Sequence, residues 1–342
     1  MPHEHTIQSV PVRTQEDAIA KLTAARETIS CELRKVIIGQ EEVIGEILTA
    51  FFARGHCLLI GVPGLGKTLL VKTLASSLDL SANRIQFTPD LMPADITGTD
   101  ILEENTTTGR RTFRFNPGPI FTNMLLADEI NRTPPKTQAA LLEAMQEQQI
   151  TVSGTRYALP KPFMVLATQN PIELEGTYPL PEAQLDRFMF CINVDYPDAD
   201  HEAQILMDTT RDLVPHIEKS LSADELIDLQ SLVRQVPVTP HVAHYAASLV
   251  RATRPGGKEA LEFVNKGVRW GAGTRAGQYL LLAAKAHVLL TGRFAVSCDD
   301  IRKYCLPVLR HRIFRNFSAA SDGITTDDII RRILEQVKEP GY

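Results

Sequence analysis

Residues 61–68 have the types and spacing that hold a polyphosphate. They read Gly-Val-Pro-Gly-Leu-Gly-Lys-Thr and match the Walker A pattern G-x-x-x-x-G-K-[ST] at every fixed position. Glycines let the backbone curl with its N–H groups towards an anion, and the following helix adds its N-terminal dipole. A plain glycine turn would need neither Lys67, a cation for the outer phosphates, nor Thr68, a hydroxyl ligand for Mg²⁺. The residues expected to contact the phosphates are Gly61, Val62, Pro63, Gly64, Leu65, Gly66, Lys67, Thr68 and Leu69.

Two carboxylates, Asp128 and Glu129, close an apolar run that begins at Met124. A protein with a phosphate loop places its Mg²⁺-coordinating acid at the C-terminal edge of such a strand, the Walker B motif. We expect Asp128 to hold the ion with Thr68, through water, and Glu129 to polarise the attacking water. The alternative is a strand that ends in two solvated acids, and the preceding phosphate loop disfavours it.

Short apolar runs alternate with helical segments around these motifs. The runs cover residues 57–60, 85–87, 124–127, 163–167 and 189–194, and helices are expected to start near Gly66, Pro134 and Pro181. Such alternation predicts a mostly parallel sheet that is covered on both faces. Two amphipathic helices are expected before the sheet, one from a cap at Thr14 and one from Gln40 to Ala53.

The pattern changes near Tyr196-Pro197-Asp198. Beyond it helical periodicity dominates and strand signals almost vanish. We therefore expect an α/β domain over residues 14–197 and a helical domain over residues 198–342. Residues 1–13 are polar with two prolines, and we expect them to be mobile.

Composition excludes several classes of protein. The net charge of −5 disfavours a duplex nucleic-acid binder, which usually carries a basic stripe. Five cysteines without a CxxC pair predict neither a disulfide framework nor a zinc site, and His241 with His244 is expected to be solvated or in the core. The first residues do not resemble a secretory signal, and the most apolar stretch, residues 279–290, is too short and polar to cross a bilayer. A cytoplasmic location is the simplest expectation.

With both motifs present, the chain resembles AAA+ ATPases and, among them, the MoxR family. The other segments that carry the resemblance are residues 87–98, the continuation Ile130-Asn131-Arg132, residues 167–171 and residues 180–188, and the likeness covers about residues 15–315. It implies a P-loop AAA+ core with a parallel five-stranded sheet and hairpin insertions, followed by a smaller all-helical lid domain. It also implies that ATP and Mg²⁺ bind and that the β–γ phosphoanhydride bond is hydrolysed.

The resemblance assigns roles to two further residues of the α/β region. Asn170 matches a sensor asparagine that positions the attacking water; the alternative is an Asn-Pro turn. Arg187 matches an arginine finger that is offered to the nucleotide of the neighbouring subunit, a task that suits a permanently charged guanidinium. The alternative for Arg187 is a salt bridge with Asp186 or Glu182.

Three other residues match family motifs outside that region's core. Arg275 matches the sensor arginine of the lid, although Gly273-Thr274 stand where the family more often has Ser-Pro. Ile38 and Gly39 match the segment that packs on adenine; alternatively they belong to a buried connector.

Two hairpins are typical of this branch. One is expected over residues 101–115 with its turn at 107–109, and the other over residues 149–159 with its turn at Ser153-Gly154. In the family such hairpins approach the centre of a ring and touch substrate or partner, while the alternative is that they only extend the core. A basic cluster at residues 309–313 is either a contact surface for a neighbour or an exposed charged turn.

The resemblance implies a homo-oligomer, most simply a hexameric ring, that remodels, matures or activates protein complexes in a chaperone-like manner. Its partners would be a client protein or a von Willebrand-type domain, without nucleic acid and without membrane insertion. Two alternatives remain, a nucleic-acid-linked AAA+ translocase and a non-hydrolysing, nucleotide-gated scaffold.

Overall fold

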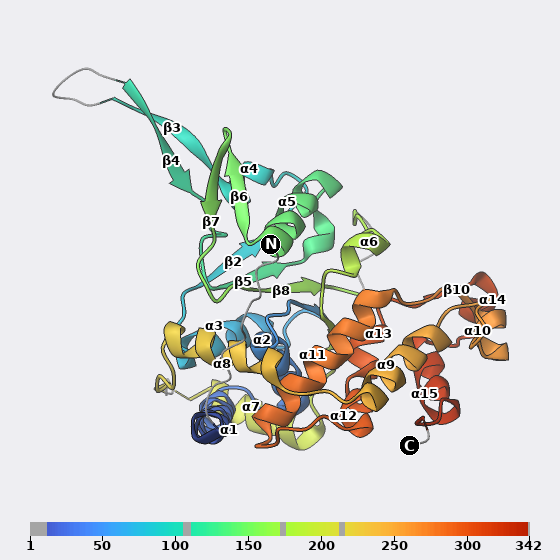
Figure 1. The fold of residues 1–342 in the computed structure, drawn as a ribbon. Coiled ribbons are helices and arrows are strands. Elements are labelled where there is room, and N and C mark those ends of the chain that lie inside the picture. Colours follow the sequence, from blue (N-terminus) through green and yellow to red (C-terminus); the bar gives the residue numbers. More distant parts are fainter. Residues whose placement is uncertain (1–11, 105–110, 172–175, 212–215, 341–342) are drawn as a thin grey trace, which may run out of the picture.

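Five parallel strands form the central sheet, in the order β2-β5-β8-β1-β9. Figure 1 labels β2, β5 and β8 of this sheet. The computed structural model describes residues 12–104, 111–171, 176–211 and 216–340. The strand bounds are β1 Cys57–Ile60, β2 Ala82–Gln86, β5 Met124–Asp128, β8 Met164–Gln169 and β9 Phe190–Asn193. Each predicted apolar run overlaps one of these strands, although β2 begins earlier than expected, at Ala82. The parallel five-stranded sheet is therefore confirmed.

Successive residues of the strands point to opposite faces of the sheet and belong to two hydrophobic clusters, one on each face. On one face, Cys57 and Leu59 belong to the same cluster as residues of α1 (Val12–Arg34), α2 (Glu41–Phe52) and α3 (Lys67–Ser77). On the other face, Leu58 belongs with α4 (Pro93–Thr97) and α5 (Pro135–Glu147). Helix α1 begins at Val12 rather than at the predicted cap at Thr14. Residues 1–11 of the segment predicted to be mobile lie outside the described residues.

Both predicted hairpins are confirmed in their described strands. Strand β3 (Gly98–Glu104) pairs antiparallel with β4 (Arg111–Pro117), and β6 (Gln149–Val152) pairs antiparallel with β7 (Thr155–Ala158). The predicted turn at 107–109 lies outside the described residues, whereas Ser153 and Gly154 form the second turn with φ of +49° and +84°. The hairpins touch through Phe115 and Tyr157, whose stacked rings have centroids 4.0 Å apart.

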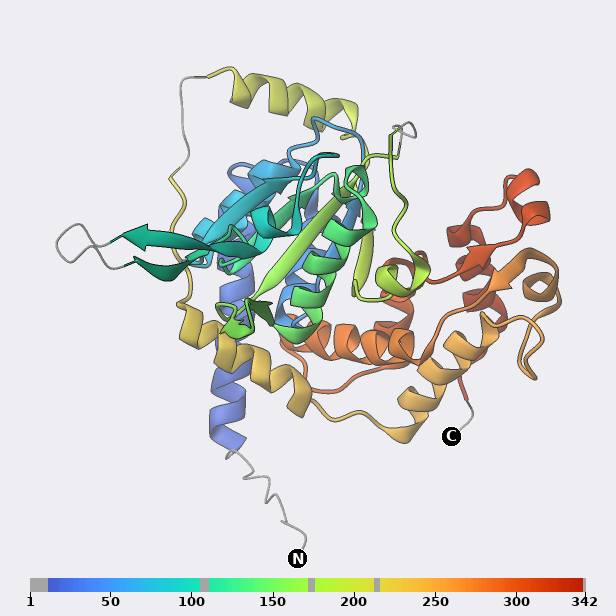
Figure 2. The same cartoon turned by 90° about the horizontal axis from the view of Figure 1, so that it is seen from above.

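The C-terminal part of the chain is helical, as predicted, with one exception. Its helices are α7 Ala199–Thr209, α8 Ala223–Gln235, α9 Pro240–Ala252, α10 Glu262–Gly267, α11 Thr274–Leu290, α12 Cys298–Lys303, α13 Cys305–Leu309, α14 Phe317–Ser321 and α15 Thr326–Gln336. The exception is a small antiparallel pair of β10 (Val268–Trp270) with β11 (Phe314–Arg315). Figures 1 and 2 place α9–α15 on the opposite side of the molecule from the β3–β4 hairpin.

Helix α11 connects the two parts of the chain. It packs against α1 and α2 as well as against α8 and α9. The hydrophobic cluster on that face of the sheet therefore continues into the helical region. The domain boundary near residue 197 stays a prediction; β9 ends at Asn193 and α7 begins at Ala199. Within the described ranges, no helix is both long and apolar enough to cross a membrane.

Candidate active site

The phosphate-loop segment connects the end of β1 to the start of α3. Gly64 and Gly66 have φ of +88° and +72°, the left-handed region that favours glycine, and an added Cβ at either would meet open space. Gly61 is needed for a different reason, because a Cβ there would lie 2.5 Å from the Val194 carbonyl oxygen. The first turn of α3 begins at Lys67, so unpaired N–H groups of a helix end face the loop. This is the backbone shape that an anion requires.

The Lys67 ammonium rests on the loop itself. Its Nζ donates to the carbonyl oxygens of Gly61 at 2.6 Å and Val62 at 3.0 Å. Partial burial lowers the pKa of Lys67, and the carboxylates of Asp128 and Glu129 oppose that shift. The cation is thus held beside the loop by acceptors that it can exchange for phosphate oxygens.

Asp128 is held at the carboxyl end of β5 by two neighbouring strands. Thr168 of β8 donates from Oγ1 to Asp128 Oδ1 at 2.5 Å. Arg84 of β2 donates from Nε and a terminal nitrogen to Oδ2, at 3.1 and 2.7 Å. Parallel strands bring these residues to one edge of the sheet, since Gln86 of β2 lies in register with Asp128.

The Glu129 side chain takes a different direction from that of Asp128. Glu129 has φ of +57°, and its backbone N–H donates to Thr168 Oγ1 at 2.8 Å. Its carboxylate accepts from Gln86 Nε2 at 2.8 Å and is paired with Arg132 at 3.3 Å. One carboxylate is therefore fixed by strand neighbours, while the next is held by Gln86 and Arg132.

A cavity of about 440 Å³ joins most of the predicted residues. Its lining consists of Pro63, Gly64, Leu65, Gly66, Lys67, Thr68, Leu69, Arg84, Gln86, Asp128, Glu129, Thr168 and Asn170. Asn170 follows β8 and is 7% exposed. Sequence reasoning missed Arg84, Gln86 and Thr168. Arg84 and Gln86 are two positions apart on β2, so their side chains lie on the same face of the strand. Only the order of the strands in the sheet shows that this face meets Asp128 and Glu129.

The predicted adenine segment does not line this cavity. Gly39 has φ of +73°, and a Cβ there would lie 2.8 Å from the His201 ring near the start of α7. The segment reaches the loop through Gln40, whose Nε2 donates to the Leu65 carbonyl oxygen at 3.1 Å. Contact of Ile38 and Gly39 with adenine stays a prediction.

The two predicted arginines also lie outside the cavity lining. Arg275, at the start of α11, is paired with Asp186 at 3.1 Å. Arg187 follows the short helix α6 (Glu182–Leu185), and across the described residues its guanidinium has no hydrogen-bonding or ion-pair partner. The alternative of a salt bridge to Asp186 or Glu182 is therefore wrong.

The basic cluster at residues 309–313 is neither exposed nor a simple charged turn. Arg312 is 3% exposed and donates from Nε to Asp186 Oδ1 at 2.7 Å. Burial lowers the pKa of Arg312, an effect that the Asp186 carboxylate opposes. Arg310 pairs with Asp327 at 3.0 Å. His311 is buried, and its Nε2 lies 3.1 Å from the Phe188 carbonyl oxygen.

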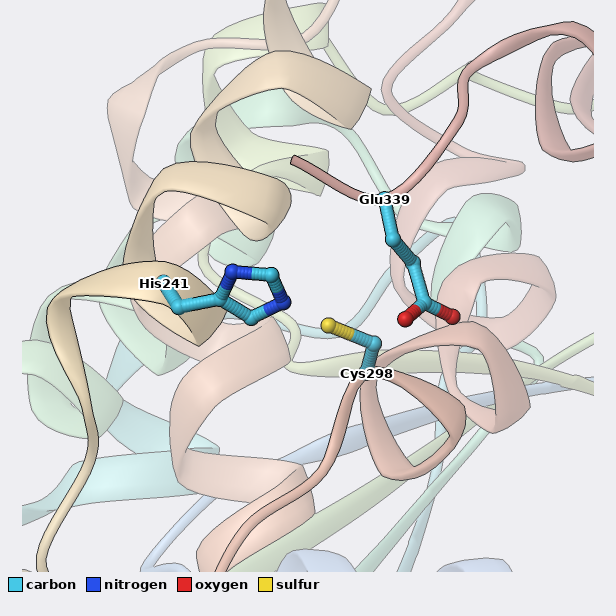
Figure 3. A group of neighbouring side chains, drawn as sticks. All are labelled: His241, Cys298 and Glu339. Carbon is cyan, nitrogen blue, oxygen red and sulfur yellow. The ribbon is translucent and has the colours of Figure 1, made fainter. Parts of the chain in front are cut away.

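A separate group of possible metal ligands lies far along the chain from these motifs. His241, Cys298 and Glu339 face one another, with ligand atoms within 4.8 Å (Figure 3). Glu339 is already paired with Arg302 at 3.3 Å, and burial raises the pKa of the Cys298 thiol. Structural zinc sites use four protein ligands, whereas this group offers three in the part of the chain that the structure describes, so we assign no metal to it.

Comparisons with known proteins agree with this geometry. Residues 56–190 match the ATPase family associated with various cellular activities (AAA), and residues 262–333 match the AAA lid domain. The chain is 42% identical to Chaperone MoxR1 of Mycobacterium tuberculosis over 311 residues, 90% of this chain and 81% of that protein. It is 41% identical to the uncharacterized protein YeaC of Bacillus subtilis over 327 residues, 95% and 97% of the two chains. The crystal structure of a candidate ATPase from Cytophaga hutchinsonii aligns with a TM-score of 0.89 at 40% identity, over 96% of this chain and 99% of that chain.

Proposed function

The chain belongs to the MoxR family of AAA+ ATPases, and we propose that it hydrolyses Mg²⁺-bound ATP in the cavity beside Lys67 to drive the remodelling of protein complexes. The observation that carries the proposal is the convergence of the phosphate loop, Asp128, Glu129 and Asn170 on one cavity. The relative MoxR1 is named a chaperone, which supports a protein complex as the target of the energy.

The donor set fits a triphosphate with a hard divalent cation. Open space above Gly64 and Gly66 leaves backbone N–H groups accessible to phosphate oxygens. Thr68 and Asp128 both line the cavity and offer the oxygen ligands that Mg²⁺ prefers. Bound Mg²⁺ would neutralise charge on the β- and γ-phosphates. Lys67 would exchange its two loop carbonyls for phosphate oxygens.

Glu129 and Asn170 both line the cavity, which supports a role for them on water at the γ-phosphate. Asn170 would orient the water by hydrogen bonding, and Glu129 would accept a proton from it. The water oxygen forms a bond to the γ-phosphorus, the bond from that phosphorus to the β–γ bridging oxygen breaks, and ADP keeps the electron pair. Gln86 and Arg132 hold the Glu129 carboxylate in position for this transfer.

Assembly into a ring would complete the site. The Arg187 guanidinium lies outside its own chain's cavity lining and has no partner in the part of the chain that the structure describes, so it is available to a neighbouring subunit. A guanidinium spreads its charge over several phosphate oxygens, which suits stabilisation of the transition state. Our proposal is a homo-oligomer, most simply a hexamer, that acts on a client protein or a von Willebrand-type domain partner.

The test is steady-state ATPase activity measured against protein concentration, with particle mass followed with and without ATP. We expect the specific activity to rise with assembly and to require Mg²⁺. Full activity of a monomer would exclude the arrangement in which Arg187 acts on a neighbour. Stimulation by DNA or RNA with a steep salt dependence would instead favour a nucleic-acid-linked translocase. ATP binding without turnover would favour a nucleotide-gated scaffold.

A further inference from the structure

A buried arginine of the helical region, Arg312, forms hydrogen bonds to the segment that carries Arg187. The Arg312 side chain is 2% exposed. Besides its bond to the Asp186 carboxylate, it donates to the carbonyl oxygens of Asp186 at 2.9 Å, Phe188 at 2.6 Å and Met189 at 3.3 Å. A buried charge is tolerated only when its donors are satisfied, and residues 186–189 satisfy most of these. The backbone on both sides of Arg187 is thereby hydrogen-bonded to the turn that follows α13, which ends at Leu309.

Helix α11 holds the same segment from a second direction. The Tyr279 hydroxyl donates to the Arg187 carbonyl oxygen at 3.2 Å, and the Arg312 guanidinium lies 5.0 Å from the centre of the Tyr279 ring. Arg275 adds its ion pair with Asp186. Three side chains of the helical region therefore converge on Asp186 and Arg187, while the Arg187 guanidinium itself stays unpaired within the described ranges.

The ion pairs that Arg275 and Arg312 form with Asp186 differ in how easily they can be broken. The Arg275 side chain is 41% exposed, so solvent screens its ion pair with Asp186 and little free energy is needed to break it. The Arg312 side chain is 2% exposed, and its bonds cannot be replaced by water. If Arg275 turns to a bound nucleotide, Asp186 still keeps Arg312. The hydrogen bonds of Arg312 then persist while the exposed contact responds to the ligand.

We propose that Arg312 is a positioning residue that couples the helical region of one subunit to the Arg187 which that subunit offers to its neighbour's ATP. The inference rests on the proposed action of Arg187 on a neighbouring subunit. Movement of α11 and α13 carries residues 186–189 with it, because the links are hydrogen bonds to the backbone as well as to a side chain. The nucleotide state of one subunit thereby changes the position of that subunit's own Arg187, which acts on the ATP of its neighbour.

Mixed assemblies can separate this role from a general structural one. The donor subunit carries Lys67→Met, so it contributes Arg187 but no working phosphate loop. The acceptor subunit carries Arg187→Ala and an intact loop. Each is expected to be nearly inactive alone, and the mixture regains activity at donor–acceptor interfaces. Arg312→Lys is then added to the donor or to the acceptor.

In the donor, Arg312→Lys should lower kcat of the mixture about ten- to hundredfold, since a displacement of about 1 Å can have that effect. The KM for ATP should stay within about twofold, because the acceptor's phosphate loop is untouched. The acceptor already lacks Arg187, so the same substitution there should matter less. The mixture with Arg312→Lys in the acceptor should have a kcat at least about fivefold higher than the mixture with Arg312→Lys in the donor. Equal losses in both subunits, or no loss in either, would overturn the proposal.

Arg310→Lys in the donor is the matched control. Arg310 is also largely buried and ion-paired, but its partners are Asp327 and the Cys191 carbonyl oxygen, outside residues 186–189. We expect its mixture to stay within about twofold of the parent mixture, and a loss as large as that of Arg312→Lys would also overturn the proposal.

If the Arg312→Lys donor does not assemble, Tyr279→Phe replaces it and removes only the hydroxyl that bonds to Arg187. A donor-specific loss of about threefold is then expected, and an equal loss in donor and acceptor contradicts the coupling. A parent mixture that stays inactive while the unmodified protein is active refutes the action of Arg187 on a neighbour, and the coupling with it. An active parent mixture that ignores these substitutions refutes only the coupling.

Discussion

Replacement of Lys67 by methionine tests the binding site most directly. Methionine keeps much of the side-chain length and apolar stem but removes the cation. Charge-assisted hydrogen bonds contribute about 1.5–3 kcal/mol each. In the free protein Nζ already has two carbonyl acceptors, at 2.6 and 3.0 Å, so nucleotide binding exchanges bonds rather than adding them. We therefore expect a net loss of about 2–3 kcal/mol, which corresponds to about 30- to 150-fold weaker ATP binding.

The assay is a fluorescence or calorimetric titration with MgATP at fixed salt. Lys72→Met is the control, because it removes the same charge from the same helix at an exposed position. Its affinity should remain within about twofold of the unmodified protein. An affinity of Lys67→Met within about threefold of the unmodified protein would refute the phosphate-loop interpretation. Equal weakening by both substitutions would show that only the overall field of the helix matters.

Three further outcomes are expected. Glu129→Gln should bind ATP but turn it over about 10²–10³-fold more slowly in a steady-state assay, since the amide cannot accept the proton; normal turnover would mean that another residue is the base. Arg187→Ala subunits should bind ATP yet inhibit the unmodified protein when the two are mixed in rising ratio, and a strictly additive activity would argue against a shared site. Burial raises the pKa of Glu46 to about 7 from 4.5, so its contribution to folding stability falls as pH rises from about 4.5 to 7. Glu46→Gln should therefore raise the free energy of unfolding by about 2–3 kcal/mol at pH 8 but little at pH 5. The measurement is a denaturant titration, with Glu42→Gln on the exposed part of the helix as the control. A gain that is the same at both pH values would contradict the pKa shift.

Patterns of residue types over a few neighbouring positions predicted much of this fold. The strands of the sheet are short apolar runs, and the second hairpin was recognisable from Ser153-Gly154 because turn residues act locally. The pair of β10 with β11 was not predictable from local pattern. Those strands have three and two residues, and they are joined by a long helical stretch. Strands this short carry no alternation that would distinguish them from a loop.

The candidate site divides in the same way. The phosphate loop and the acidic pair could be identified from sequence because each motif occupies neighbouring positions. Arg84, Gln86 and Thr168 could not, because they reach the acids across the sheet, and the order β2-β5-β8 is set by long-range packing.

The amino-acid order by itself determined the glycine-rich loop of residues 61–68, the two carboxylates after a buried strand, and the change from an α/β to a helical pattern. All three depend on interactions within a few residues. Only the tertiary structure decided that Arg312 is buried rather than exposed and that its partner is Asp186, because a charge can leave water only where distant parts of the chain supply its hydrogen-bond acceptors. The same long-range folding leaves Arg187 attached through its backbone to the helical region while its guanidinium has no partner among the described residues.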